Sequence, residues 1–413
     1  FRNNEAQCIF AAGTSAIYLY GDGAAADYAG VFVIESDSGQ DGMQFVKNVA
    51  GNGIRLAGEV ARFREALEKW NIPFVTTWPG ADLVPTDHPL NTGILGMMGQ
   101  GGANKAVQEC DYLLAIGTHL AMPQTTTLTD RFAPKAKIAM VNIDADQLAN
   151  LTVRVDHPHA IGIKEWLDDP SGVPVNGDFS AWRSMCEEFK RLNAIGHPRA
   201  SSGVNSYVFN DLMNRMLPEG TRIVIDGGGT ALYTGFQSAY IKEGTRLICS
   251  GSVSSMGSGL CEAIGACFAS DGGLTTCLIG DGSLMLNIQE LQTIRHHKLP
   301  IKIFVVSNKG YLSVRHTQDA FLEGRRFGTG CYEANDISWP RIEAQARSYD
   351  IPYMRISALP NAESVIGACL RIPGPVLCEV MCPEDQAMRW KQKFSKEGDK
   401  FVPHTLDDME EGL

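Results

Sequence analysis

The stretch TTCLIGDGSLMLNIQELQTIRHHKLPIKIFVVSNKGY, residues 275–311, decides the predicted fold. It contains two short apolar runs, and the residues between them have a helical pattern. Two strands that bracket a helix form a βαβ unit with parallel strands. The first run ends in Gly280-Asp281-Gly282, and the second, from Ile301 to Val306, stops at Ser307-Asn308-Lys309-Gly310. Parallel strands end at the same edge of a sheet, so we expect Asp281 and Asn308, 27 positions apart, to lie close together.

The residue types at this edge suit a divalent cation that holds a diphosphate. Magnesium prefers oxygen ligands. A carboxylate, an amide and a backbone carbonyl are available, so we predict the metal ligands Asp281, Asn308 and Gly310. Glycines let the backbone approach a ligand closely. The predicted cofactor-binding residues are Gly280, Asp281, Gly282, Ser283, Asn308 and Gly310.

Two further features bear on this interpretation. Asn287-Ile288-Gln289-Glu290 is typical of a capping box, with Asn287 as the cap of a helix whose N-terminus would face the phosphates. A lone Gly-Asp-Gly triplet is also typical of a tight turn. Gly21-Asp22-Gly23 is a second such triplet, and Asn48 follows it at nearly the same distance, but no capped helix lies between them. The combination of strand, turn, capped helix and second strand therefore favours residues 275–311 as the diphosphate and metal site.

The triplet Gly280-Asp281-Gly282, followed after 25 residues by Asn308, resembles the cofactor motif of the thiamine-diphosphate-dependent enzymes, closest to acetolactate synthase and its relatives. The family usually has two successive asparagines, and the first of them is Ser307 here. The resemblance extends to residues 254–260, SSMGSGL, where the family has a glycine-rich turn with a methionine. It implies that Met256 supports the thiazolium and pyrimidine rings in a bent conformation.

Composition bounds the other properties of the chain. With 413 residues, 44% of them hydrophobic, we expect two to three domains. A net charge of −11 and a pI near 5.3 argue against a nucleic-acid or anionic-membrane partner. The sequence contains no apolar run of about 18 residues, and its start, FRNNEAQC, is unlike a signal sequence. Eleven cysteines without a CxxC pair predict reduced, mostly buried thiols in a cytoplasmic protein.

Residues 1–43 are too few for a domain, and we expect them to be a remnant of the family's pyrimidine-binding domain. Either stretches of that domain are missing from the sequence or the molecule is truncated. Glu5 precedes Phe10-Ala11-Ala12 by five positions, which resembles the segment whose glutamate activates the cofactor. The resemblance implies that Glu5 and Met256 act in catalysis. A glutamate on a helix surface is the alternative interpretation of Glu5.

Residues 44–195 are predicted to form a central nucleotide-fold-like domain. A glycine turn is followed by a helix with Leu56, Val60, Phe63 and Leu67 at helical spacing. The predicted strands are Phe74 to Thr77, Asp111 to Ile116 and Lys137 to Ile143. Residues 77–80 and 93–102 resemble the central domain of acetolactate synthase-like enzymes, several of which hold FAD without redox use. GILGMMGQGG departs from the flavin-binding version at its centre, which leaves FAD open as a second cofactor.

Residues 205–413 are predicted to form the thiamine diphosphate and magnesium domain, which makes the whole an α/β protein of parallel-sheet domains. Its first strand is expected at Ile223 to Ile225, running into Asp226 and a glycine turn that either approaches phosphate or is an ordinary strand-to-helix turn. Residues 311–330 show no clear periodicity and predict a mobile loop, in which His316 is a candidate acid or base. The acidic end, HTLDDMEEGL, is expected at the surface or in an oligomer contact.

The resemblance implies an enzyme that decarboxylates a 2-oxo acid, such as pyruvate, and then joins the product to a second carbonyl or protonates it. The second carbonyl substrate is left open. The family's active site lies between two subunits, which implies a homodimer or homotetramer. Three alternatives remain: a simple 2-oxo acid decarboxylase, an inactive or truncated cofactor-binding protein of the same family, and a redox enzyme that binds a dinucleotide in residues 44–195.

Overall fold

The computed structural model describes residues 45–170, 173, 177–195, 203–250, 253–330, 336–397 and 400–411. Glu5 and the triplet Gly21-Asp22-Gly23 lie outside the described residues, so the interpretations of both stay predictions. Within the part that is described, no helix is both long enough and apolar enough to cross a membrane.

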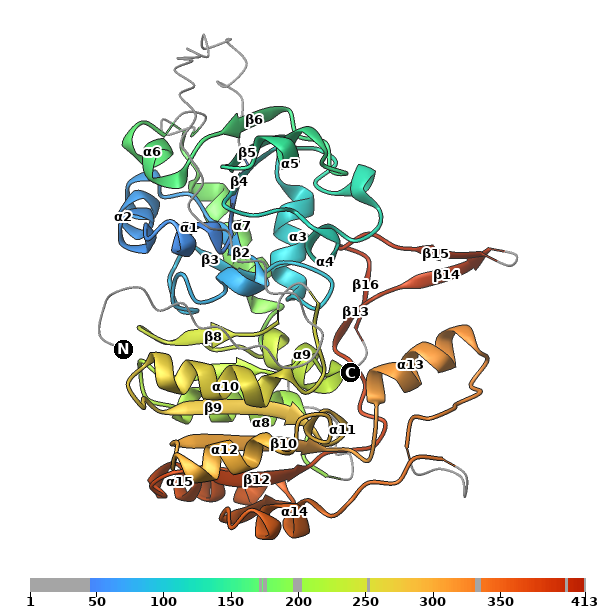
Figure 1. Ribbon diagram of the computed structural model, residues 1–413. Coiled ribbons are helices and arrows are strands. Elements are labelled where there is room, and N and C mark those ends of the chain that lie inside the picture. The colour runs from blue at the N-terminus through green and yellow to red at the C-terminus, as the bar shows by residue number, and fades with distance from the viewer. Residues whose placement is uncertain are drawn as a thin grey trace. The chain divides into compact units, whose positions relative to one another are not determined.

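Six parallel strands form the first sheet, in the order β3-β2-β1-β4-β5-β6 (Figure 1). They are β1 (Val46–Ala50), β2 (Phe74–Thr76), β3 (Asn91–Ile94), β4 (Tyr112–Ile116), β5 (Lys137–Asn142) and β6 (His157–Ala160). The predicted strands correspond to β2, β4 and β5. Strand β1 was not predicted because Lys47 and Asn48 interrupt its apolar run, yet both side chains are fully buried.

Most of the longer helices of the first sheet bury apolar side chains, whereas α5 has no buried residue. They are α1 (Gly53–Leu56), α2 (Val60–Trp70), α3 (Gly101–Glu109), α4 (Met122–Thr125), α5 (Ala145–Ala149), α6 (Ile163–Asp168) and α7 (Ser180–Arg191), with the short 3-10 turns η1 (Trp78–Gly80) and η2 (Thr129–Arg131). Phe63 and Leu67 pack into the core from α2 as predicted. The prediction for Leu56 was wrong: this residue ends α1 and is 82% exposed, because Gly58 (φ +76°) breaks the helical run.

The second sheet also has six parallel strands, in the order β11-β12-β10-β9-β7-β8. They are β7 (Arg222–Ile225), β8 (Arg246–Ile248), β9 (Thr275–Gly280), β10 (Ile301–Ser307), β11 (Tyr353–Ile356) and β12 (Val376–Met381). The two runs in residues 275–311 are therefore β9 and β10, which pair directly with Gly280 opposite Val306. The predicted α/β class with parallel sheets is confirmed.

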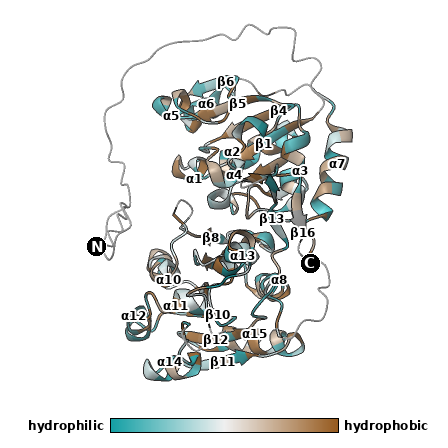
Figure 2. Cartoon of the chain, turned by 90° about the vertical axis from the view of Figure 1, so that its right-hand side faces the viewer, coloured by the Kyte–Doolittle hydropathy of each residue, from teal (hydrophilic) through white to brown (hydrophobic). Residues whose placement is uncertain are grey.

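Helices cover both faces of the second sheet (Figure 2). One face packs against α8 (Ser206–Met216), α9 (Gly229–Gln237) and α15 (Ala362–Arg371), and the other against α10 (Ser258–Ala269), α12 (Glu290–His296) and α14 (Ile342–Ser348). Alternate residues of β10 serve the two cores: Phe304 and Val306 face one, and Ile303 and Val305 face the other. This alternation explains why the strand is apolar on both faces from Ile303 to Val306; the exception before it is Lys302, whose Nζ donates to the carbonyls of Ile372 and Gly374.

The segment after β10 corrects the prediction of a mobile loop for residues 311–330. Leu312–Phe321 form the helix α13, whose buried residues are Leu312 and Arg315. The remaining short elements are α11 (Asp281–Leu284), η3 (Leu359–Asn361) and four strands near the end of the chain, β13 (Trp390–Gln392), β14 (Phe394–Glu397), β15 (Lys400–Pro403) and β16 (Met409–Glu411). Strands β14 and β15 form a hairpin (Figure 1), and Phe394 and Phe401 contact Phe321 of α13.

Candidate cofactor site

Asp281 is the first residue after β9, at the carboxyl edge of the second sheet. Its side chain is buried, with 3% exposed. One carboxylate oxygen accepts a hydrogen bond from the Gly282 N–H at 2.7 Å. The other accepts from the N–H groups of Asn308 (3.0 Å) and Lys309 (2.7 Å). The structure thus brings Asp281 and the Asn308 segment into direct contact, as the sequence predicted.

Asn308 follows β10 and is almost fully buried. Its Nδ2 donates to Thr230 Oγ1 in α9 at 3.1 Å. This bond fixes the orientation of the side-chain amide and therefore the position of Oδ1. Its backbone carbonyl accepts from Arg315 Nη2 at 3.1 Å. Thr230 and Arg315 were missed by sequence reasoning, because their contacts with Asn308 span 78 and 7 residues without a motif.

Gly282 and Gly310 are required by close packing. A Cβ at Gly282 would overlap the Tyr311 ring, and one at Gly310, whose φ is +142°, would overlap the Thr329 carbonyl oxygen. Gly280 and Ser283 belong to the same turn as Asp281. The five predicted turn and loop residues Gly280, Asp281, Gly282, Ser283 and Asn308 therefore lie together with Gly310 at one edge.

The electrostatics of Asp281 suit a cation. Burial raises the pKa of its carboxyl group to about 6, although the backbone N–H donors oppose that shift. A divalent cation would supply the positive charge that favours the ionised form. Among the residues that the structure describes, no group of three or more His, Cys, Asp or Glu side chains could hold a metal ion. The predicted magnesium donors are the Asp281 carboxylate, the Asn308 amide and the Gly310 carbonyl, a set that would leave positions for phosphate oxygens, and this assignment stays a prediction.

Met256 lies in the turn before α10, and 40% of the residue is exposed. The following residue, Gly257, has φ +86° and is the N-cap of that helix. Asn287 Nδ2 donates to the Gly257 carbonyl at 3.1 Å. The predicted capping box was therefore wrong: α12 begins at Glu290, Gln289 is its N-cap, and the Asn287 side chain makes a tertiary bond to the Met256 turn instead.

Asp226 is a residue whose importance sequence reasoning missed. It directly follows β7, is fully buried, and accepts hydrogen bonds from Gly228, Gly257 and Gly259. Burial raises the pKa of its carboxyl group, and the hydrogen bond from Ser283 opposes that rise. An acidic residue between a strand and a glycine run, the same pattern as at Asp281, was the signal that could have found it.

His88, His296, His297 and His316 have ordinary surroundings. His88 Nε2 lies 2.9 Å from Glu68 Oε1 at the surface. His296 ends α12, and His297 is its C-cap. His316 lies in α13, and burial lowers the pKa of its imidazole. Its role as an acid or base stays a prediction.

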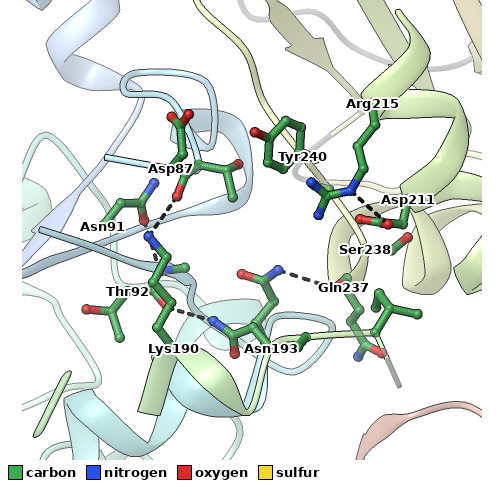
Figure 3. A pocket seen from close by; sticks show the side chains of 16 residues that line it. Asp87, Asn91, Thr92, Lys190, Asn193, Asp211, Arg215, Gln237, Ser238 and Tyr240 are labelled. Atoms are coloured by element: carbon green, nitrogen blue, oxygen red, sulfur yellow. Dashed lines mark hydrogen bonds and ion pairs between the residues drawn. The ribbon is translucent and has the colours of Figure 1, made fainter. Parts of the chain in front are cut away.

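A pocket of about 360 Å³ is lined by residues including Asn91 and Thr92, which begin β3 (Figure 3). The pocket therefore adjoins the amino end of β3, at the opposite end of this strand from the carboxyl edge of the first sheet. Several of its polar side chains already make hydrogen bonds or ion pairs within the chain. Lys190 donates to the carbonyls of Thr86 and His88, Asn193 to that of Thr92, and Arg215 pairs with Asp211. We therefore place the candidate site at the edge that holds Asp281.

Comparisons with known proteins identify the family of the two domains. Residues 48–168 match the family model "Thiamine pyrophosphate enzyme, central domain", and residues 227–380 match "Thiamine pyrophosphate enzyme, C-terminal TPP binding domain". Acetolactate synthase 1, chloroplastic, of Zea mays is 29% identical over 343 residues, which cover 81% of this chain and 53% of that protein. Acetolactate synthase isozyme 2 large subunit of Escherichia coli is 28% identical over 334 residues, 81% of this chain and 59% of that protein. The chain spans about half the length of these relatives.

Proposed function

The chain belongs to the thiamine pyrophosphate enzymes, and from this premise we propose that it decarboxylates a 2-oxo acid such as pyruvate and joins the product to a second carbonyl compound. The similar proteins named acetolactate synthase support this reaction class. The observation that carries the proposal is the Asp281 carboxylate at the edge of the matched cofactor-binding domain. It is buried, and it accepts a hydrogen bond from the Asn308 N–H at 3.0 Å.

We assign the binding roles as follows. Asp281, Asn308 and Gly310 would hold a magnesium ion, and the ion would hold the diphosphate. Bound thiamine diphosphate supplies the carbon nucleophile and electron sink that decarboxylation needs. Gly280, Gly282 and Ser283 would let the backbone approach the phosphates. Tyr311 covers Gly282 from one side and contacts Trp339 edge-on, with ring centroids 5.1 Å apart, so that this side of the turn is shielded from water.

Met256 would support the two rings of the cofactor, and Glu5 would activate the pyrimidine ring. Support for Met256 comes from its position in a turn whose backbone is bonded on both sides, to Asp226 and to Asn287. Glu5 rests on the sequence resemblance alone. Placing the ring between a fixed methionine and a fixed diphosphate would orient its reactive carbon toward the substrate carbonyl, and such orientation lowers the entropic part of the barrier.

The test is an assay of the full chain with pyruvate, magnesium and thiamine diphosphate. We expect both carbon dioxide and a carboligation product such as acetolactate. Carbon dioxide without a carboligation product would indicate a simple decarboxylase, and cofactor binding without carbon dioxide an inactive cofactor-binding protein. Glu5→Gln should retain cofactor affinity by calorimetry and lose turnover. Full turnover in Glu5→Gln would refute the role of Glu5.

Three finer properties belong to the same proposal: FAD as a second cofactor in the region 48–168, assembly as a homodimer or homotetramer, and a cytoplasmic location. Absorbance of the purified protein near the flavin bands tests the first. Light scattering coupled to size-exclusion chromatography tests the second, and cell fractionation tests the third. A flavin that copurifies and is required for hydride transfer would instead favour the redox alternative.

A further inference from the structure

The Asp226 carboxylate has a hydrogen-bond donor at each oxygen, and the donors come from three different turns. One oxygen accepts from the N–H of Gly257 at 2.7 Å and of Gly259 at 3.0 Å. The other accepts from the N–H of Gly228 at 2.8 Å. The Ser283 hydroxyl is a fourth donor to the same carboxylate. A fully buried carboxylate is retained in a protein only when donors of this kind compensate its desolvation.

The three turns approach Asp226 so closely that side chains are excluded. A Cβ at Gly259 would lie 2.9 Å from the Asp226 Cβ. A Cβ at Gly228 would overlap the Ser283 hydroxyl, and one at Gly227 would overlap the backbone of Ser254. Asp226 therefore lies where the turn after β7, the Met256 turn and the Asp281 turn converge.

The Met256 turn depends on Asp226 through the next residue. The Gly257 N–H donates to the Asp226 carboxylate, and the Gly257 carbonyl accepts from Asn287 Nδ2. Gly257 has φ +86°, a conformation available to glycine without strain. The bond to Asp226 fixes the peptide that joins Met256 to Gly257, and the bond from Asn287 fixes the peptide that follows Gly257. Together they set the direction in which the Met256 side chain leaves the backbone.

We propose that Asp226 is a positioning residue, which sets the Met256 side chain relative to the Asp281 turn by bonding both at once. This inference rests on the proposed function, which assigns Met256 to ring support and Asp281 to the diphosphate site. Asp226 acts through these two turns and does not itself touch the cofactor. A carboxylate is needed because its two oxygens accept on both sides, whereas an asparagine would offer one acceptor oxygen and one donor.

The experiment uses the full chain labelled with methyl-13C methionine. The Met256 methyl signal is the one that disappears in Met256→Leu. We expect Asp226→Ala to move or broaden this signal while the signals of the buried Met140 and Met213 stay in place. Asp226→Asn keeps one acceptor oxygen, so its displacement should be smaller but measurable. Glu262→Gln is the matched control, because Glu262 is a neighbouring half-buried carboxyl that bonds Ser258 within α10.

Calorimetric titration with thiamine diphosphate and magnesium gives the second readout. We expect affinity to fall at least about tenfold in Asp226→Ala, because the turns lose their common acceptor, and to stay within about twofold in Glu262→Gln. If Asp226→Ala does not fold, Asp226→Asn carries the test. A Met256 signal that moves no further in Asp226→Asn than in Glu262→Gln overturns the inference.

The two readouts separate this inference from the proposed function. If the wild-type chain does not bind thiamine diphosphate with magnesium, the proposed function fails, while the Met256 signal still reports whether Asp226 sets the turn. If the wild type binds the cofactor but a folded Asp226→Ala keeps both its affinity and its Met256 signal, the inference fails and the proposed function stands.

Discussion

The two sheets have six parallel strands each, but the residues that directly follow their strands differ in chemistry. In the first sheet these residues are uncharged: Gly51, Thr77, Leu95, Gly117, Ile143 and Ile161. In the second sheet, the three adjacent strands β7, β9 and β10 are followed by Asp226, Asp281 and Asn308. Ligands of open parallel sheets bind outside the carboxyl ends of the strands. The fold therefore supplies two such edges, and the side chains decide which one takes a cation and a diphosphate.

The buried charge of the first sheet lies elsewhere. Lys47 is the second residue of β1 and is fully buried, and its Nζ contacts Thr92 and, at 3.4 Å, Cys186 Sγ of α7. Burial lowers the pKa of this amine, as it raises that of the carboxyl of Asp281. We infer that Lys47 serves the packing of α7, whereas Asp281 serves a ligand.

The largest expected effect is that of Asp281→Ala. We expect the magnesium-dependent binding of thiamine diphosphate to fall at least about a thousandfold, below detection by calorimetry, because the only carboxylate of the donor set is removed. The matched control in the first sheet is Asp144→Ala. Asp144 also lies just beyond a strand, but its side chain caps α5 through Gln147. That variant should lose about 1 kcal/mol of stability and keep its cofactor affinity. Unchanged affinity in Asp281→Ala would remove the basis of the comparison.

Asn308→Ala should weaken cofactor binding about a hundredfold, because the cation keeps Asp281 but loses the amide oxygen. Asn142→Ala is its counterpart in the first sheet. Asn142 ends β5 and bonds Asp144 and Gln147. Calorimetry should show no change of affinity in Asn142→Ala. Equal losses in the two variants would mean that the effect is one of sheet stability and not of ligation.

Met256→Ala should slow turnover about tenfold, and its effect on thiamine diphosphate affinity should be smaller, because Met256 would orient the rings and the diphosphate site would stay intact. Steady-state kinetics with pyruvate, compared with calorimetry, separates the two quantities. Met140→Ala, in the core of the first sheet, should lower stability instead. Wild-type turnover in Met256→Ala would refute its assigned role.

Acidification should weaken cofactor binding. The carboxyl pKa of Asp281 is raised to about 6 in the ligand-free chain. Below that pH the cation must displace a proton, so affinity should fall by up to about tenfold per pH unit. The folding stability of the ligand-free protein should rise on acidification. The raised pKa means that the folded chain binds more protons than the unfolded chain between pH 6 and 3.8. Affinity that is constant from pH 7.5 to 5 would contradict this account.

The smallest expected effect is that of Lys47→Met. Removing a desolvated amine should leave cofactor affinity unchanged and keep the free energy of unfolding at pH 7 within about 1 kcal/mol of wild type. Because burial lowers the pKa of this amine in the folded chain, the unfolded chain binds more protons between the folded pKa and its own pKa of 10.5, and wild-type stability should rise with pH in that range. Urea titrations at pH 7 and 9.5 should show this rise in wild type and its loss in Lys47→Met. A drop in cofactor affinity would mean that the two sheets are coupled.

The second sheet was predictable from sequence where its strands are mostly apolar: β10 has one lysine, Lys302, among residues 301–306, and β9 has a run from Cys277 to Ile279. Ile301 to Val306 and the run before Gly280 are buried on both faces, so that their pattern could be read without alternatives. Strand β1 was not predictable, because Lys47 and Asn48 are polar residues that only the tertiary structure buries. Local pattern reports what a segment can form, whereas burial of a polar side chain depends on partners that are distant in sequence.

The candidate site shows the same division. Asp281, Asn308 and the glycines could be found because a spacing joined them. Asn287 has the pattern of a helix cap, yet its amide bonds Gly257, 30 residues away. Asp226 follows a strand that was predicted from sequence, but its hydrogen bonds to Gly257 and Gly259 span more than 30 residues. Tertiary hydrogen bonds of this kind leave no periodicity in the sequence.

The most direct test of the central claim is the position of the metal ion in crystals grown with thiamine diphosphate and manganese in place of magnesium. The account predicts an anomalous difference peak within about 2.3 Å of both an Asp281 carboxylate oxygen and Asn308 Oδ1. A cofactor bound with its metal more than about 4 Å from either side chain would contradict it.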